Sequence, residues 1–143
     1  STMPGTTAFL GGVLLPNGKV FFVPYGSTSA RIYDAETDTV TTPTPTFPGS
    51  NAYLGGVLMP SGKVLLIPAN QTKPGFYDYL TDTYTTGSVA WHATTFAFYG
   101  GCMMLDGRIF VAGYNSLRHE IYTDILVNQQ TTLTLSPFLN KAV

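Results

Sequence analysis

Hydrophobic residues along this chain gather in short runs that are bounded by glycine, proline and small polar residues. The run Ala8–Leu15 ends at a turn-forming triplet, Pro16-Asn17-Gly18, and a second run, Lys19–Val23, follows at once. Short apolar runs rich in β-branched and aromatic residues, with turn residues between them, are typical of strands. No stretch holds apolar residues at the helical period over three turns, so we expect an all-β fold.

The same succession occurs three times. Each unit carries an aromatic triplet, a glycine pair, a turn and then a basic residue that opens a second apolar run, and the glycine pairs Gly11-Gly12, Gly55-Gly56 and Gly100-Gly101 stand 44 and 45 residues apart. So many residue types in register indicate an internal repeat. We expect one repeat domain over residues 1–143, with units of about 3–46, 47–90 and 91–135 and a terminal cap or exchange segment at 136–143.

The first unit predicts four strands. Asn17-Gly18 predicts a tight hairpin turn of the primed type, and the continuous run Lys19–Val23 predicts a strand buried on both faces. Arg31–Asp34 alternates in polarity and predicts a third strand, whose Asp34 can accept hydrogen bonds from the amides of the next turn. Thr39–Thr42 predicts a partly exposed fourth strand. Four antiparallel strands in about 44 residues match one β-propeller blade.

The second and third predicted strands carry a family resemblance. A hydrophobic second strand is followed by a Tyr-Asp third strand in Val20–Val23 with Ile32-Tyr33-Asp34, and again in Val64–Ile67 with Phe76-Tyr77-Asp78. In these residues the units resemble kelch repeats, and the resemblance implies three four-stranded antiparallel blades per chain. Pro24-Tyr25 stands where a kelch repeat has a glycine pair, and Thr123 replaces the Asp in the third unit.

Three blades leave two open edges, because propellers usually close with four to eight blades. Open edges pair with other chains, so a homodimer of six blades is the simplest completion, with other oligomers or a longer array as alternatives. A β-trefoil or β-prism also fits three units of four strands and closes within one chain. The buried second strand and the Tyr-Asp third strand favour the propeller, whose inner strands they resemble.

Charge and composition narrow the function. Charged residues make up 10% of the chain and its net charge is −1, against roughly 25% charged residues in ordinary soluble domains. The clustered Lys and Arg of nucleic-acid binders are missing, and no apolar run approaches the ~18 residues of a membrane span. Lys19, Lys63 and Arg108 recur once per unit beside a turn, where we expect them to guard strand ends against aggregation.

The sequence contains few candidate catalytic residues. His92 and His119 lack metal-ligand spacing, and no Gly-x-Ser-x-Gly motif occurs. Cys102, the single cysteine, lies in an apolar run and is expected to be a buried small hydrophobe. We therefore expect no catalytic residue, no metal site and no cofactor. The alternative is a fragment of a carbohydrate-active or copper oxidase propeller enzyme, since copper oxidases with kelch-type propellers exist.

The loops between the second and third strands differ most between units, and in a propeller they cluster on one face. They carry tyrosines beside neutral hydrogen-bonding groups, which suit a glycan or a surface protein, and the candidate residues are Tyr25, Ser27, Asn70, Gln71, Tyr114, Asn115 and Arg118. The weakly charged, Thr- and Gly-rich repeats also look like those of viral or phage fibre and spike domains. That resemblance implies a non-enzymatic host-surface recognition module with an extracellular or virion location; a β-trefoil-type lectin is the alternative.

Overall fold

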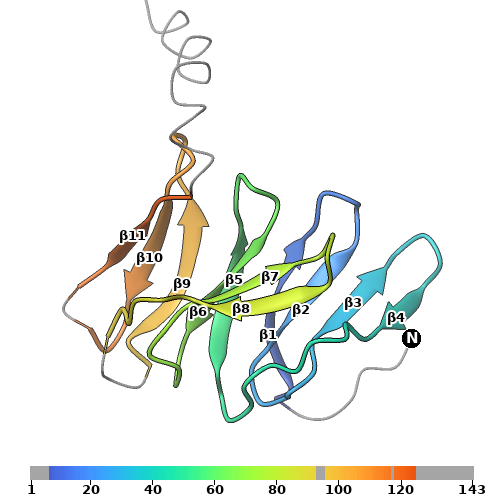
Figure 1. The fold of residues 1–143 in the computed structure, drawn as a ribbon, viewed down its shortest axis with the longest axis horizontal. Helices are drawn as coiled ribbons and strands as arrows, with labels where there is room; N and C mark the ends of the chain where they lie inside the picture. The colour runs from blue at the N-terminus through green and yellow to red at the C-terminus, as the bar shows by residue number, and fades with distance from the viewer. Residues whose placement is uncertain (1–6, 93–95, 117, 125–143) are drawn as a thin grey trace, which may run out of the picture.

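The structure is a computed structural model that describes residues 7–92, 96–116 and 118–124. These residues form three separate antiparallel sheets, which stand side by side in Figure 1 and which we call blades 1, 2 and 3. Blade 1 holds β1 (Phe9–Leu14), β2 (Val20–Pro24), β3 (Arg31–Asp34) and β4 (Thr39–Thr41). Blade 2 holds β5 (Tyr53–Leu58), β6 (Val64–Pro68), β7 (Gly75–Asp78) and β8 (Thr83–Thr86). Blade 3 holds β9 (Phe98–Met103), β10 (Ile109–Gly113) and β11 (Glu120–Tyr122).

The all-β, blade-based fold is confirmed, with one sheet for each repeat unit. The described part of blade 3 has three strands, and the position of its predicted fourth strand lies outside the described residues. The proposed cap or exchange segment at 136–143 also lies outside them. No helix of the described residues is long and apolar enough to cross a membrane.

The first strand of each blade is the innermost one. Strands follow chain order across each sheet, and β5 contacts both β1 and β9, so neighbouring blades meet along these first strands. The expectation that the second and third strands would be the inner ones was therefore wrong by one position. The glycine pairs are the reason: a Cβ added at Gly56 would lie 3.0 Å from Cγ2 of Val13, so glycine allows adjacent blades to approach closely.

The turn between the first two strands differs from the predicted primed type. Gly18 has a φ of 81°, and the amide of Gly18 donates to the carbonyl of Leu15 at 3.0 Å. The amide of Leu15 donates in turn to the carbonyl of Lys19 at 2.8 Å. This is the pattern of a three-residue loop, in which an ordinary β-turn with Pro16 at its second position is followed by a left-handed glycine. A primed turn over Asn17-Gly18 would need a positive φ at Asn17, which Asn17 does not have, and would place Pro16 where the hairpin needs a backbone N–H that proline lacks.

Burial of the second strands depends on the place of the blade in the array. Every residue of β6 is buried, as predicted for a strand covered on both faces. In β2 the half-buried Val20 and Phe22 alternate with the buried Phe21 and Val23. Blade 2 alone has a described blade on each side, so its neighbours explain the difference.

Two hydrophobic cores fill the spaces between the blades. The core between blades 1 and 2 contains Phe21 stacked on Tyr77 at a ring distance of 4.6 Å, with Phe47 from the connector packed beside them. The core between blades 2 and 3 is built mainly from aliphatic side chains around Phe98. The repeat therefore stabilises itself through contacts between neighbouring units.

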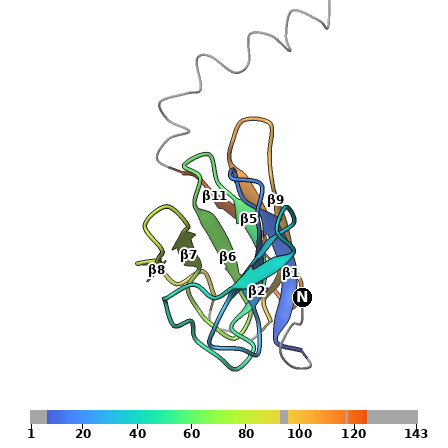
Figure 2. The ribbon, with the colours of Figure 1, turned by 90° about the vertical axis from the view of Figure 1, so that its right-hand side faces the viewer.

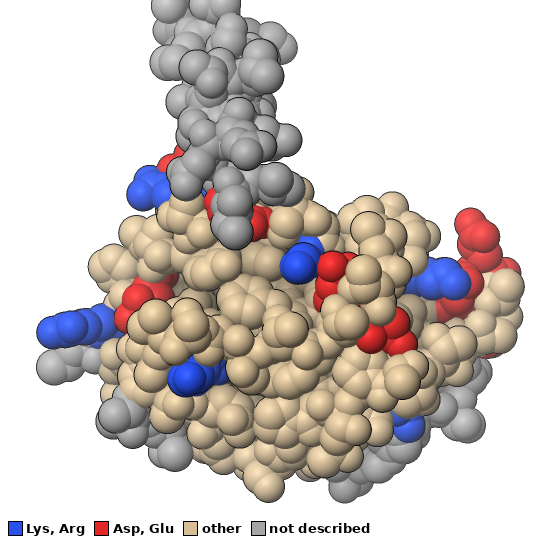
Figure 3. Space-filling view, viewed as in Figure 1, with Lys and Arg blue, Asp and Glu red and all other residues tan. Residues whose placement is uncertain are grey.

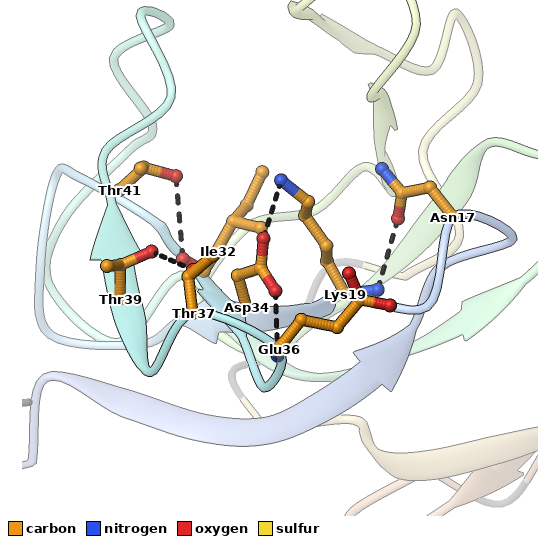
Figure 4. Close-up of polar contacts among 8 residues, drawn as sticks. All are labelled: Asn17, Lys19, Ile32, Asp34, Glu36, Thr37, Thr39 and Thr41. Atoms are coloured by element: carbon orange, nitrogen blue, oxygen red, sulfur yellow. Dashed lines mark hydrogen bonds and ion pairs between the residues drawn. The ribbon is translucent and has the colours of Figure 1, made fainter.

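The recurring basic residues form ion pairs across strands. Nζ of Lys19 lies 3.0 Å from Oδ2 of Asp34, and the amide of Glu36 donates to Oδ1 of Asp34 at 3.0 Å (Figure 4). The predicted role of Asp34 in its turn is thus confirmed. In blade 2 the same pair, Lys63 and Asp78, is 3.6 Å apart. The lysine side chains of these pairs are 43% and 48% exposed, and each aspartate is 19% exposed, so solvent screens the pairs and they orient neighbouring strands more than they stabilise the fold.

Blade 3 lacks this cross-strand pair because Thr123 occupies the Asp position. Arg108 instead pairs with Asp106 of its own turn, with Nε 2.6 Å from Oδ2. The loss of one acidic residue therefore redirects the basic residue from the sheet to the turn.

Asp82 links blade 2 to the connector that leaves blade 1. Its Oδ2 accepts a hydrogen bond from the amide of Thr44 at 2.9 Å, and its Oδ1 accepts one from the hydroxyl of Tyr77 at 2.9 Å. Burial raises the pKa of Asp82, but the hydrogen bonds from Thr44 and Tyr77 outweigh it and hold the pKa below its usual value. The carboxylate therefore favours the folded state above the unfolded pKa of about 3.9.

We expect the free energy of unfolding to fall as the pH drops below about 4 and through the lower folded pKa of Asp82. Asp82→Asn should lose part of this pH dependence and lower the free energy of unfolding by about 1 kcal/mol at pH 7. The asparagine amide has one oxygen, so it cannot replace both carboxylate oxygens as hydrogen-bond acceptors. Urea unfolding of both proteins between pH 2.5 and 7 measures this. An unchanged pH slope in the variant would contradict the assignment.

Candidate functional site

The loops that follow β2, β6 and β10 lie at one edge of the array, opposite the tight turns (Figure 1). Backbone hydrogen bonds join the first two of these loops to the next blade: the carbonyl of Tyr25 accepts from the amide of Ala52 at 3.0 Å, and the carbonyl of Ala69 accepts from the amide of Phe96 at 2.8 Å. We call this edge the loop rim, defined by residues 25–30, 69–74, 114–116 and 118–119. The predicted clustering of these loops on one face is thus a property of the fold.

In the first loop the candidate residues serve the loop itself. The hydroxyl of Ser27 donates to the carbonyl of Ser29 at 2.9 Å and accepts from the amide of Ser29 at 3.0 Å. Tyr25 is half-buried, and its backbone bridges the start of β1 and the start of β5. The first loop therefore offers little free hydrogen-bonding capacity.

The second loop is partly committed in the same way. Nδ2 of Asn70 donates to the carbonyl of Ser50 at 2.9 Å, and the amide of Asn70 donates to the carbonyl of Asn51 at 3.1 Å. These two bonds fasten the loop to the connector that leads into blade 2. Asn70 remains exposed and Gln71 is half-buried, so their amides still reach the surface of the rim.

The third loop is the most open part of the rim. Tyr114 is 63% exposed and Tyr99 is 61% exposed, and their ring centroids lie 5.2 Å apart. Asn115, which follows Tyr114 in the chain, and Arg118, four residues after Tyr114, are also exposed. The third loop thus carries an exposed aromatic pair, an exposed amide and an exposed guanidinium.

Tyr99 was not among the residues predicted from the sequence. It belongs to the apolar run that forms β9, and the hydrogen bond from the amide of Tyr114 to the carbonyl of Ala97, at 2.7 Å, brings the two tyrosines together. A signal existed in the repeat, because Leu10 and Leu54 occupy the corresponding positions and only the third unit carries a hydroxyl there.

The seven predicted residues share the rim, and none of them lines the two clefts found among the described residues. One of these clefts, of about 420 Å³, lies between the outer parts of blades 2 and 3 and is lined by Met59, Ser61, Lys63, Phe76, Thr85, Tyr122 and Asp124. Oδ2 of the buried Asp124 accepts a hydrogen bond from the amide of Ser61 at 2.9 Å. The hydrogen bond of Asp124 therefore fastens the turn of blade 2 to blade 3. Burial is the main cause that raises the pKa of Tyr122, and the charge of Asp124 is a smaller one.

Charged side chains are scattered over the face seen in Figure 3 and gather into no large patch of one sign. Among the described residues, no three His, Cys, Asp or Glu side chains come together in a way that could hold a metal ion. The ring of His92 packs on that of Phe98 with a centroid distance of 5.0 Å, and the ring of His119 packs on that of Phe110 with a centroid distance of 5.2 Å. Each described histidine therefore has an aromatic packing partner.

Cys102 is exposed, so the expectation of a buried thiol was wrong. Cys102 lies on β9. Its repeat equivalent in blade 1 is Val13, which is buried in the core between blades 1 and 2. No described blade follows blade 3, which leaves the corresponding face of β9 open.

No protein-family model matches the chain, and no curated protein matches its sequence. Solved structures do match its fold. Virginiamycin B lyase from Staphylococcus aureus superposes with a TM-score of 0.64 at 12% identity, covering 87% of this chain and 44% of the lyase. The fold is a partial β-propeller. A trefoil or prism closed within the chain is thereby set aside.

Two further structures share the fold. The hydrazine synthase of Kuenenia stuttgartiensis matches with a TM-score of 0.59 at 16% identity over 85% of this chain and 36% of the synthase. A fungal alcohol oxidase of the AA5 family, in complex with copper, matches with a TM-score of 0.55 at 18% identity over 73% of this chain and 27% of the oxidase. The chain spans less than half the length of each neighbour, and identities this low establish the fold alone.

Proposed function

We propose that the chain is a non-enzymatic binding module whose loop rim recognises a neutral glycan on a surface. The exposed Tyr99–Tyr114 pair carries this proposal, since its ring centroids lie 5.2 Å apart and the exposed Asn115 follows Tyr114 in the chain. Aromatic faces pack against the C–H groups of sugars, while amide and guanidinium groups bond their hydroxyls. Asn70 and Gln71 on the neighbouring loop extend the same chemistry along the rim.

The biological setting we propose is the fibre or spike of a virus or phage, where such a module would bind a host surface. The support is compositional: 10% charged residues and a net charge of −1 leave the surface without a strong field, which fits a neutral ligand. The kelch-like character of the blades belongs to the same proposal and rests on the Tyr-Asp third strands.

The alternative is a fragment of a carbohydrate-active or copper oxidase propeller enzyme. Its support is the shared fold of the copper-bound AA5 oxidase, which says nothing about this chain's own ligands. Metal analysis of the purified protein separates the two hypotheses. Stoichiometric copper would favour the enzyme and count against a binding module.

The glycan proposal predicts a loss of binding when the rim is changed. On a panel of immobilised neutral oligosaccharides, the wild-type chain should bind at least one, and Tyr114→Ala and the double variant Asn115→Ala/Arg118→Ala should each weaken binding at least about tenfold, the equivalent of 1.4 kcal/mol. Titration calorimetry with the best oligosaccharide gives the dissociation constants.

Glu36→Ala is the matched control, because Glu36 is exposed in the turn between β3 and β4, away from the rim. It should bind as the wild type does. Glycan binding that survives both rim variants would place recognition elsewhere, and a chain that binds no glycan on the panel would defeat the proposal.

A further inference from the structure

Both interfaces inside the chain are built from the same repeat positions. Each blade offers a trailing face to the blade that follows: Val13, Leu15, Phe21 and Val23 in blade 1, and Val57, Met59, Leu65 and Ile67 in blade 2. The blade that follows packs against it with its own leading face, which consists of Ala52, Tyr53, Val64 and Leu66 in blade 2, and of Ala97, Phe98, Ile109 and Val111 in blade 3. All of these side chains are buried, so one type of apolar contact occurs twice.

The two outer faces of the array carry the same positions without a described partner. The leading face of blade 1 consists of Ala8, Phe9, Val20 and Phe22, which are only half-buried, although their equivalents in blade 2 are fully buried. This side of the array faces the viewer in Figure 2. The trailing face of blade 3 consists of Cys102, Met104, Phe110 and Ala112, of which Cys102 and Ala112 are exposed.

We propose that a second copy of this chain docks its blade 1 leading face on the blade 3 trailing face of the first copy. The reciprocal contact joins the other two faces, and a six-bladed ring closes by a two-fold axis. Open apolar faces of this kind are a liability that closure removes. A head-to-tail contact that closes on itself gives a ring with a defined number of copies.

The size of the neighbouring propeller supports one further copy rather than several. This chain covers 44% of the virginiamycin B lyase chain, so two copies account for most of a ring of that size. Backbone geometry points the same way. The carbonyl of Tyr114 occupies the position of the Tyr25 and Ala69 carbonyls, each of which accepts an amide from the start of the next inner strand. In the ring this donor would come from the start of β1 in the second copy, so the Tyr99–Tyr114 pair of the proposed glycan site would lie at the joint between the two copies.

The interface between blades 1 and 2 provides a template for one contact in the ring. A Cβ added at Gly56 lies 3.0 Å from Cγ2 of Val13 across this interface, whereas a Cβ added at the equivalent Gly101 meets Cδ1 of Ile67 across the interface between blades 2 and 3. Cys102 is the repeat equivalent of Val13, and Gly12 is the repeat equivalent of Gly56. If the joint between the copies follows the interface between blades 1 and 2, Cys102 of one copy lies against Gly12 of the other, within reach of a disulfide once position 12 is cysteine.

Two measurements on the 143-residue chain test the inference. Sedimentation equilibrium at tens of micromolar should give twice the 15.4 kDa chain mass. Mild oxidation of Gly12→Cys should give a covalent dimer on non-reducing gels, and reductant should reverse it. A Cβ at Gly12 meets Cγ1 of Val20 at 3.0 Å, a side-chain atom, and φ at Gly12 is not left-handed, so the backbone tolerates the change.

Gly12→Cys/Cys102→Ser and Glu36→Cys are the controls, and neither should form the covalent dimer. A monomeric wild type, a mass other than two chains, or a dimer whose cross-linking does not depend on position 12 would each overturn the inference. If Gly12→Cys fails to fold, Phe22→Asp decides the question: a folded monomer supports the ring, and a persistent dimer contradicts it. A dimer that binds no glycan would support this inference while defeating the proposed function.

Discussion

Phe47→Ala is expected to lower the free energy of unfolding by about 3–5 kcal/mol, the usual cost of truncating a buried phenylalanine. Phe47 is 1% exposed and belongs to the connector between blades 1 and 2. Its ring packs against Tyr84 at 4.8 Å, Tyr77 at 6.0 Å and Phe21 at 6.1 Å. Alanine would leave a cavity among three rings from two blades, and β-sheets held by cross-strand bonds cannot collapse to fill it.

Urea unfolding followed by circular dichroism measures this loss, with all proteins at one concentration so that self-association affects each equally. Leu80→Ala is the matched control. Leu80 is 77% exposed in the turn between β7 and β8, and its truncation should change stability by less than about 0.5 kcal/mol. A loss below about 1 kcal/mol for Phe47→Ala would show that the connector does not hold the two blades together.

The strands and their order were predictable because the local signals agree with one another. Arg31–Asp34 is observed as the predicted third strand, and the fourth strand ends one residue before the prediction, at Thr41. Hydrophobic pattern, turn glycines and repeat spacing all pointed to the same elements, which is how a sequence specifies its fold. The turn type at Pro16-Asn17-Gly18 was missed because Asn-Gly favours a primed turn, but such a turn needs a backbone N–H at position 16, which proline lacks.

Burial could not be predicted from one unit alone. Cys102 and Val13 occupy the same repeat position, yet one is exposed and the other buried. The sequence around each residue is apolar in both cases, and the difference comes from whether a blade lies on the far side. A periodic sequence describes the interface between units but not which unit has a neighbour on each side.

The candidate site was predictable in its location and less so in its composition. The fold places all three variable loops on one rim, but the hydroxyl of Ser27 and the Nδ2 group of Asn70 bond to nearby backbone. Short polar side chains in loops often satisfy local backbone groups, which a sequence does not distinguish from ligand contacts. Tyr99 joins Tyr114 only through the register of β9 against β10, information that arises from pairing in space.

The second large effect is expected at Gly101, and the neighbouring Gly100 provides its control. A Cβ added at Gly101 would lie 2.6 Å from the carbonyl oxygen of Phe110 and 3.2 Å from Cδ1 of Ile67. The first is backbone of the paired strand, which cannot move without breaking the β9–β10 ladder. We therefore expect Gly101→Ala to cost about 2–3 kcal/mol, as overpacking of a tight site does.

Gly100→Ala is the control for this prediction. No atom lies within 4 Å of a Cβ added at Gly100, and its φ is not left-handed, so alanine should be neutral or stabilise the fold by roughly 0.4–1 kcal/mol through the unfolded state. Urea unfolding of the two variants, which differ by one position in the same strand, isolates the effect of close approach from that of losing a glycine. Equal costs would mean that the second glycine of the pair is not required by contact with β10 and blade 2.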